Sequence, residues 1–97
     1  MHTIEKTYTI KNTYGLHIRP STAICSTVKK YDSTVKIHYK NQVVDARSVI
    51  NLLTLSVKHG EDIKIEATGK DAKKVIAELG DLIDNYFGLK EELEKVQ

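Results

Sequence analysis

The sequence has few of the residues that mark secreted, metal-binding or membrane-bound proteins. A single cysteine, Cys25, cannot form an internal disulfide or a pair of cysteine ligands, and this favours a reducing compartment. The 15 Lys and Arg nearly balance the 13 Asp and Glu, so the net charge points neither to nucleic acid nor to a membrane surface. The opening MHTIEKTYTI has charges and no long apolar run, so we expect no signal peptide, no membrane insertion and a cytoplasmic protein.

A chain of 97 residues is long enough for one hydrophobic core, so we expect a single domain, 1–88, with a charged C-terminal tail, 89–97. The tail could add a frayed helical turn, and its acidic residues are expected to be solvated. These residues are Glu91, Glu92 and Glu94.

Hydrophobic periodicity predicts the order strand, helix, strand, strand, helix, strand, helix. The predicted strands are 3–10, 33–40 and 62–69, with a hairpin through 40–42 into Val43 and Val44. The predicted helices are one that begins at or just after His17 and is broken at Asp32, a short one that opens at Ser48 and stops at Gly60, and a long one over 71–87. Strands with one apolar and one polar face form a sheet that is covered on one side. The predicted class is an α+β open-faced sandwich.

The junction between the first strand and the first helix carries the most chemistry. Gly15 permits a sharp, positive-φ turn, and Pro20 suits the first turn of a helix, where backbone N–H groups lack intrahelical partners. A helix should therefore begin at or just after His17. The backbone N–H groups of Ile18 and Arg19 would then be free to bind an anion at the positive end of the helix dipole.

His17 is the candidate nucleophile, because a neutral imidazole beside bound phosphate can attack phosphorus and hold the group on nitrogen. Arg19 is the candidate clamp, since a guanidinium can hydrogen-bond phosphate oxygens and stabilise charge on the transferring group. The alternative from the same residues is ordinary helix-start chemistry, with His17 as a capping or surface histidine.

The run Gly15–Pro20, GLHIRP, resembles the G-L-H-x-R-P signature of HPr, the histidine-containing phosphocarrier family of the bacterial phosphoenolpyruvate-dependent phosphotransferase system. The segments 48–55 and 66–69 match two further stretches of that family, and the resemblance extends over 3–88. It implies a four-stranded antiparallel sheet with three helices on one face. It also implies a phosphoryl carrier, not a stand-alone enzyme, with no cofactor and no metal.

By the same resemblance, enzyme I would phosphorylate His17 on Nδ1, and the chain would pass the group to IIA components for sugar uptake, with Arg19 assisting both transfers. An apolar docking surface would lie beside His17. Its candidate members are Ile18, Val49, Ile50 and Leu53. We expect Leu52 and Leu55, on the same short helix, to face the core.

Ser48 is a second candidate site, because in Firmicutes-type relatives the serine at this place is phosphorylated by HPr kinase/phosphorylase. Here Asn51 and Ser56 stand where those relatives usually have glycine. Capping of the short helix by the Ser48 hydroxyl is therefore the favoured interpretation.

Two alternatives remain open. SVINLL and the stretch 85–88 also resemble the nitrogen-related paralogue of HPr, which would use the same chemistry on His17 for regulation. A module of a different class, a non-catalytic α+β interaction domain, would use His17 only as a cap. An RNA-binding sheet is disfavoured, because the polar strand faces offer lysines but little on which bases could stack.

Overall fold

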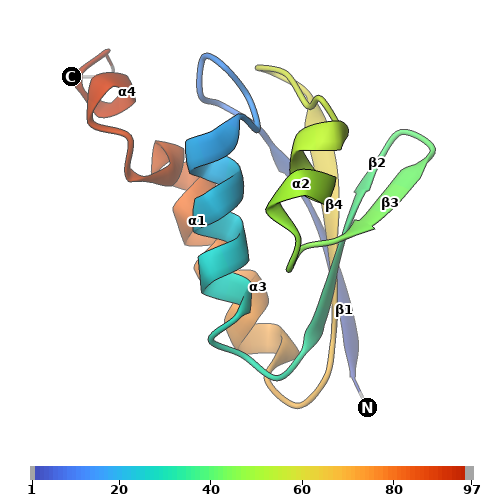
Figure 1. The fold of residues 1–97 in the computed structure, drawn as a ribbon. Helices are drawn as coiled ribbons and strands as arrows, with labels where there is room; N and C mark the ends of the chain where they lie inside the picture. Colours follow the sequence, from blue (N-terminus) through green and yellow to red (C-terminus); the bar gives the residue numbers. More distant parts are fainter. Residues whose placement is uncertain (1, 96–97) are drawn as a thin grey trace.

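Alternating apolar and polar residues produce four strands, which join in one antiparallel sheet of order β1-β4-β2-β3. The computed structural model describes residues 2–95. The strands are β1 (Thr3–Thr9), β2 (Thr34–Tyr39), β3 (Gln42–Asp45) and β4 (Asp62–Thr68), and the helices that cover the sheet are α1 (Ile18–Val28), α2 (Val49–Thr54) and α3 (Ala72–Asp84). Figure 1 shows this arrangement.

The sheet is apolar on one face and polar on the other. In β4, Ile63 and Ile65 are buried, while the intervening Lys64 points to the open face, where its Nζ lies 2.8 Å from a carboxylate oxygen of Glu5 on β1. The hydrogen bond and charge of Lys64 lower the pKa of the Glu5 carboxyl below its usual value. The open-faced α+β class predicted from the alternation is confirmed.

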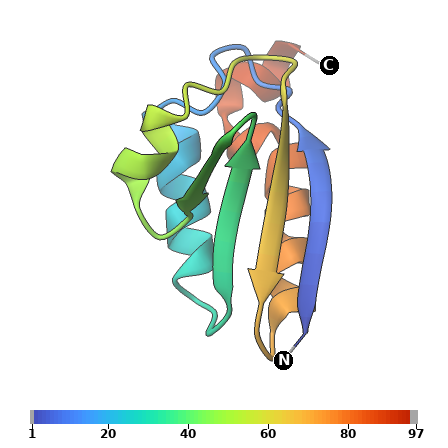
Figure 2. The same cartoon turned by 90° about the vertical axis from the view of Figure 1, so that its right-hand side faces the viewer.

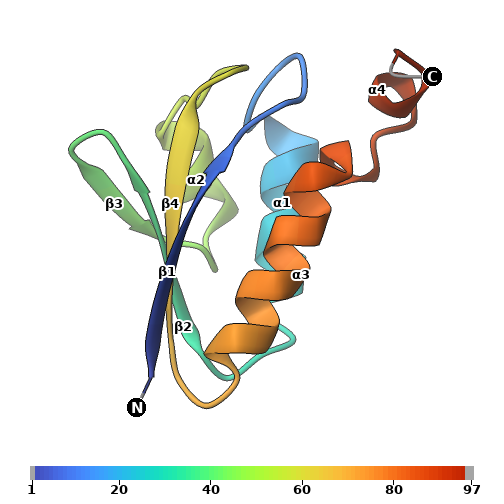
Figure 3. The ribbon, with the colours of Figure 1, turned by 180° about the vertical axis from the view of Figure 1, so that it is seen from behind.

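The helices pack on the apolar face, as Figures 2 and 3 show from two sides. α1 and α3 lie side by side along the sheet, and α2 packs beside α1 near β3. The largest fully buried side chains come from both layers: Ile10, Ile24, Ile37, Leu52, Leu55, Ile63, Ile65, Leu79, Ile83, Val28, Val35 and Val75. No helix within residues 2–95 is long and apolar enough to cross a membrane.

The second helix is shorter than the sequence predicts. α2 ends at Thr54, and Ser56 adopts a left-handed conformation with φ 57°. Beyond it, the Val57 carbonyl accepts a hydrogen bond from Leu16 N–H at 3.0 Å. The chain therefore leaves the helix before Gly60, because Val57 is needed as a partner for the loop that follows β1.

Two further short elements follow α3: the 3-10 turn η1 (Tyr86–Gly88) and a fourth helix, α4 (Lys90–Lys95). Six residues of the predicted tail are thus helical, and its last two lie outside the described residues.

The expectation that the acidic residues of the tail are all solvated is wrong for one of them. Glu91 and Glu94 are exposed, but Glu92 retains 5% of its accessible surface. The reason lies just before α4, where Phe87 and Leu89 are buried in the core and draw the segment onto the body of the protein.

Candidate functional site

The loop between β1 and α1 turns sharply at Gly15, as predicted. Its φ is +65°, in the left-handed region. The backbone passes so close to the segment before β4 that a Cβ at Gly15 would lie 2.1 Å from the Val57 carbonyl oxygen. The same carbonyl accepts the hydrogen bond of Leu16 N–H. Glycine is therefore required here for two reasons, the sign of φ and the space.

The turn that precedes β4 is hydrogen-bonded to the beginning of this loop. Ile10 N–H donates to the Glu61 carbonyl at 2.9 Å, and Gly60 N–H donates back to the Ile10 carbonyl at 2.7 Å. The Glu61 carboxylate accepts hydrogen bonds from Tyr39 Oη at 2.6 Å and from Lys58 N–H at 2.8 Å. These two bonds, that of Tyr39 first, lower the pKa of the Glu61 carboxyl below its usual value. The Glu61 carboxylate thus links Tyr39 of β2 to the turn that precedes β4.

His17 is the N-cap residue of α1, but its imidazole does not cap the helix. Only its backbone does so, with N–H donating to the Gly15 carbonyl and C=O accepting from Ser21 N–H, both at 3.0 Å. The half-buried ring meets the exposed Tyr14 ring edge to face, with centroids 6.1 Å apart and planes at 89°. The geometry thus argues against the capping interpretation of the His17 side chain and leaves the imidazole available for chemistry.

The start of α1 lies directly beyond that imidazole. Ile18 and Arg19 occupy the first turn of an 11-residue helix, where backbone N–H groups have no intrahelical acceptor. Pro20, the next residue, is buried and has no N–H to leave unpaired. Two donors and the positive end of the helix dipole therefore adjoin His17, and this combination favours an anion.

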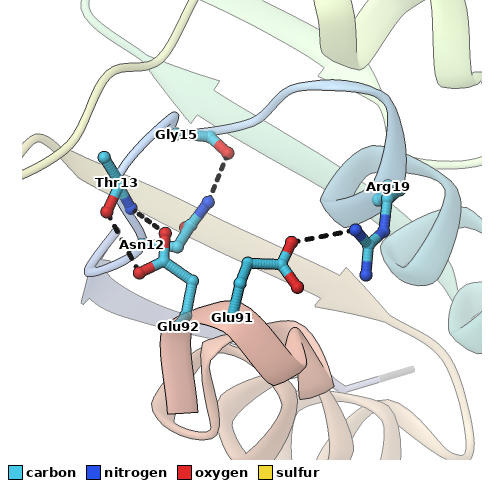
Figure 4. A network of polar contacts seen from close by, with 6 residues as sticks. All are labelled: Asn12, Thr13, Gly15, Arg19, Glu91 and Glu92. Carbon is cyan, nitrogen blue, oxygen red and sulfur yellow. Dashed lines mark hydrogen bonds and ion pairs between the residues drawn. The ribbon is translucent and has the colours of Figure 1, made fainter. Parts of the chain in front are cut away.

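The guanidinium of Arg19 has a partner that the sequence did not reveal. Its Nη1 lies 2.9 Å from Oε1 of Glu91 in α4, and Figure 4 shows the two side chains pointing toward one another. The side chains of the pair are 60% and 54% exposed. Sequence reasoning missed Glu91, because a separation of more than seventy residues carries no local signal. It also missed Tyr14, which the motif itself could have suggested as an aromatic beside the histidine.

The predicted docking residues lie on α1 and α2, and two of them are strongly exposed. Ile18 is 64% exposed and Ile50 is 72% exposed, while Val49 and Leu53 are half-buried. The two leucines expected in the core are there: Leu52 and Leu55 are fully buried. Because α2 packs against α1, the exposed isoleucines lie on neighbouring helices.

Ser48 caps α2, as predicted. Its hydroxyl oxygen accepts a hydrogen bond from Asn51 N–H at 3.2 Å. Cys25 is a buried free thiol that donates to the Arg47 carbonyl. Among residues 2–95 there is no group of three or more His, Cys, Asp or Glu side chains placed to hold a metal ion.

Gly15→Ala is expected to destabilise the fold by about 2 kcal/mol or more, because a left-handed alanine costs roughly 1–2 kcal/mol and the new Cβ must also displace Val57. Urea unfolding measures the difference. Gly60→Ala is the matched control, since Gly60 also has a positive φ but faces open space. Equal losses in the two variants would show that the contact with Val57 contributes nothing.

Comparison with known proteins gives a consistent result. The family described as "PTS HPr component phosphorylation site" matches residues 4–85. The chain is 38% identical over 85 residues to a multiphosphoryl transfer protein of Haemophilus influenzae and 34% identical over 85 residues to one of Vibrio cholerae. Each match covers 84% of this chain but only 17% and 21% of those proteins.

Solved structures agree with these matches. HPr-C-His from Thermoanaerobacter tengcongensis superposes with a TM-score of 0.86 at 36% identity, over 90% of this chain and 98% of that one.

Proposed function

Because this chain belongs to the HPr family of the phosphotransferase system, we propose that it is a phosphocarrier that accepts and donates a phosphoryl group on His17. The observation that carries the proposal is the imidazole of His17, which stands at the start of α1 without capping it. A histidine whose ring has no structural hydrogen bond there, beside unpaired helix amides, suits phosphate chemistry.

The proposed step moves a phosphoryl group from a phosphorylated donor protein to the imidazole of His17. A ring nitrogen of neutral His17, Nδ1 by family resemblance, attacks the phosphorus of a phosphorylated donor, and an N–P bond forms. The bond between the donor and phosphorus breaks, and its electron pair stays with the donor. The other ring nitrogen of His17 keeps its proton. The reverse sequence delivers the group to the next acceptor, so the chain is a carrier and not a stand-alone enzyme.

The helix start supplies the stabilising charge for this step. The N–H groups of Ile18 and Arg19 face the phosphoryl oxygens, and the Arg19 guanidinium adds charge-assisted hydrogen bonds. In the unphosphorylated chain that guanidinium pairs with Glu91. An exposed ion pair of this kind is worth at most about 1 kcal/mol, so a phosphoryl group with its larger charge can replace Glu91 as the partner of Arg19.

We further propose that partners dock on the apolar surface formed by Ile18, Val49, Ile50 and Leu53. Exposed apolar side chains grouped beside a reactive residue are typical of a transient interface. The proposed partners are enzyme I, which draws on phosphoenolpyruvate, and IIA components. A cytoplasmic location is consistent with the free thiol of Cys25, because reducing compartments keep thiols unpaired.

The experiment that tests the proposal is incubation of the chain with phosphoenolpyruvate and enzyme I. We expect one phosphate per chain, bound in an acid-labile and base-stable form that is typical of a phosphohistidine. A protein that takes up no label from an enzyme I known to be active would contradict the carrier function.

Two pathways share this chemistry, and the choice between them lies in the partners. We propose sugar uptake as the first candidate and nitrogen-related regulation as the alternative, which the stretches SVINLL and Asn85–Gly88 favour by resemblance. Phosphotransfer rates measured with a sugar-type and a nitrogen-type pair of enzyme I and IIA decide it. The functional pair is expected to transfer faster by an order of magnitude or more. A difference of about 1.4 kcal/mol in the free energy of docking is enough for a tenfold preference between partners.

Ser48 is proposed first as a structural cap. Ser48→Ala removes the acceptor for Asn51 N–H, so we expect α2 to loosen and the free energy of unfolding to fall by about 1 kcal/mol. Ser48→Asp keeps a capping oxygen and is expected to retain that stability in urea unfolding. An equally large loss in both variants would contradict the capping role.

Regulatory phosphorylation of Ser48 is the second proposal for this residue. A phosphate there would put negative charge beside the docking surface and slow transfer from an acidic partner. Incubation with ATP and HPr kinase/phosphorylase tests it, with an acid-stable phosphate expected in the wild type and absent from Ser48→Ala. The absence of label from the wild type would leave Ser48 as a cap alone.

A further inference from the structure

The residues that follow the family-matched region are packed against the phosphorylation site. The family matches residues 4–85, and the described chain continues for a further turn, η1, and helix, α4. Phe87 and Leu89 are buried in the main hydrophobic cluster. Phe87 and Leu89 therefore fix the beginning of this segment to the body of the protein. The position of α4 is set by this anchoring and not by the stability of so short a helix.

Two consecutive residues with positive φ follow α3 and change the direction of the chain before α4. Tyr86 and Phe87 have φ of 54° and 56°, in the left-handed region that non-glycine residues seldom adopt. Such residues persist where surrounding packing over-determines them, and here the buried Phe87 side chain provides that packing. α4, which follows this bend, lies beside the loop between β1 and α1, as Figure 4 shows.

Glu92 of α4 holds that loop directly. Its Oε1 accepts a hydrogen bond from Thr13 N–H at 2.6 Å, and its Oε2 accepts one from the Thr13 hydroxyl at 3.0 Å. A carboxylate that retains only 5% of its accessible surface needs such donors to offset the loss of water. Charge-assisted bonds to a backbone N–H are also stronger than neutral ones.

The effect of Glu92 reaches His17 through a short series of contacts. Thr13 follows Asn12, whose side-chain amide donates to the Gly15 carbonyl at 2.7 Å. That carbonyl also accepts the N–H of His17 at 3.0 Å. The placement of the His17 backbone thus depends on the conformation of the loop to which α4 is bonded.

The neighbouring Glu91 reaches the other functional side chain. It is exposed and pairs with the Arg19 guanidinium, whereas Glu92 is buried and bonds the loop. Successive residues of one helical turn therefore contact both sides of the site, the loop before His17 and the first turn of α1.

We propose that α4 is a working part of the phosphorylation site, in which Glu92 is a positioning residue for His17 and Glu91 holds Arg19 until a phosphoryl group arrives. The proposal rests on His17 being the acceptor. It adds that residues outside the family-matched region set the rate of transfer, by fixing the loop and by competing for the guanidinium.

The test compares the full-length wild type with Glu92→Ala, Glu92→Gln and Glu94→Ala, using phosphorylated enzyme I as donor. Glu92→Ala is expected to lower kcat about tenfold, because small displacements of reacting groups cost one to two orders of magnitude. KM should stay within about twofold, because the docking surface is untouched. Glu92→Gln keeps a carbonyl acceptor and should recover most of the rate. Glu94, exposed on the same helix, is the matched control.

Thr13→Val is a second variant, which guards against misfolding of the first. It removes the hydroxyl but keeps the backbone N–H, so a smaller loss of kcat is expected than in Glu92→Ala. The NMR signals of the His17 ring should move in both variants and stay in place in Glu94→Ala. Unchanged kcat and ring signals in folded Glu92→Ala would overturn the positioning role, even if that variant unfolds more easily.

Glu91→Gln tests the other half of the proposal. Release of Arg19 from its carboxylate should raise the rate of phosphoryl acceptance about twofold to fivefold, the range expected for loss of an exposed ion pair. An unchanged or lower rate would overturn the competition. If the wild type itself accepts no phosphate, the proposed function fails, whereas equal rates in all variants would refute only the role of α4.

Discussion

His17→Ala is expected to abolish phosphoryl acceptance by this chain. Alanine has no nucleophilic nitrogen, and no other residue stands at the start of α1 to replace it. The variant should still fold, because the His17 ring makes no capping hydrogen bond and its contact with Tyr14 is an edge-to-face pair worth about 1 kcal/mol. Acid-labile phosphate after incubation with phosphoenolpyruvate and enzyme I is the measurement, with circular dichroism as the check on folding.

His38→Ala is the matched control for this variant. His38 lies on the open face of the sheet, where its Nε2 is 2.9 Å from the Glu66 carboxylate, on the opposite side from the helices. Its removal should leave labelling at the level of the wild type. Label that persists in folded His17→Ala, or that disappears in His38→Ala, would place the acceptor elsewhere.

Arg19→Gln is expected to slow phosphoryl transfer in both directions by roughly tenfold to a hundredfold, since a hydrogen bond to a charged group contributes about 1.5–3 kcal/mol. We expect the guanidinium to bring a full positive charge to the phosphoryl oxygens. Arg19→Lys keeps the charge but not the planar pair of donors, so its rate should fall between those of the wild type and Arg19→Gln. Rapid-quench measurement of both transfers gives the comparison.

The control for Arg19→Gln is Arg47→Gln, which makes the same change of charge outside the start of α1. Arg47 is exposed, and its guanidinium donates to the Tyr31 carbonyl at 2.9 Å. If the two variants slow transfer equally, the effect belongs to the overall charge and Arg19 has no role as a clamp.

The sequence predicted the elements well, because most of them depend on local patterns. Alternation of apolar residues in 62–68 leaves one face to bury, which is enough to specify β4. Gly15, His17 and Pro20 together specify a sharp turn followed by a helix start, since each acts on its own backbone. The capping of α2 by Ser48 was predictable for the same reason.

The end of α2 and the role of the tail were not predictable in this way. α2 ends at Thr54, and the Val57 carbonyl beyond it accepts a hydrogen bond from Leu16 N–H. Leu16 lies far from Val57 in the sequence, so no local pattern indicates this contact. Charged residues in the tail indicate a solvated segment by composition alone. Only the packing of Phe87 and Leu89 brings Glu92 against the loop and makes it a buried acceptor.

The sequence by itself therefore determined where His17, the proposed phosphoryl acceptor, stands: at the N-cap of a helix, after a glycine turn and before an arginine. The tertiary structure alone decided what that site contacts. α1 packs against α2, and Arg19 meets Glu91 because η1 leads the chain from α3 into α4 beside the start of α1. The physical reason is that adjacent residues determine helix starts and turns. An ion pair between residues far apart in the sequence forms only once the packing of the core has brought them together.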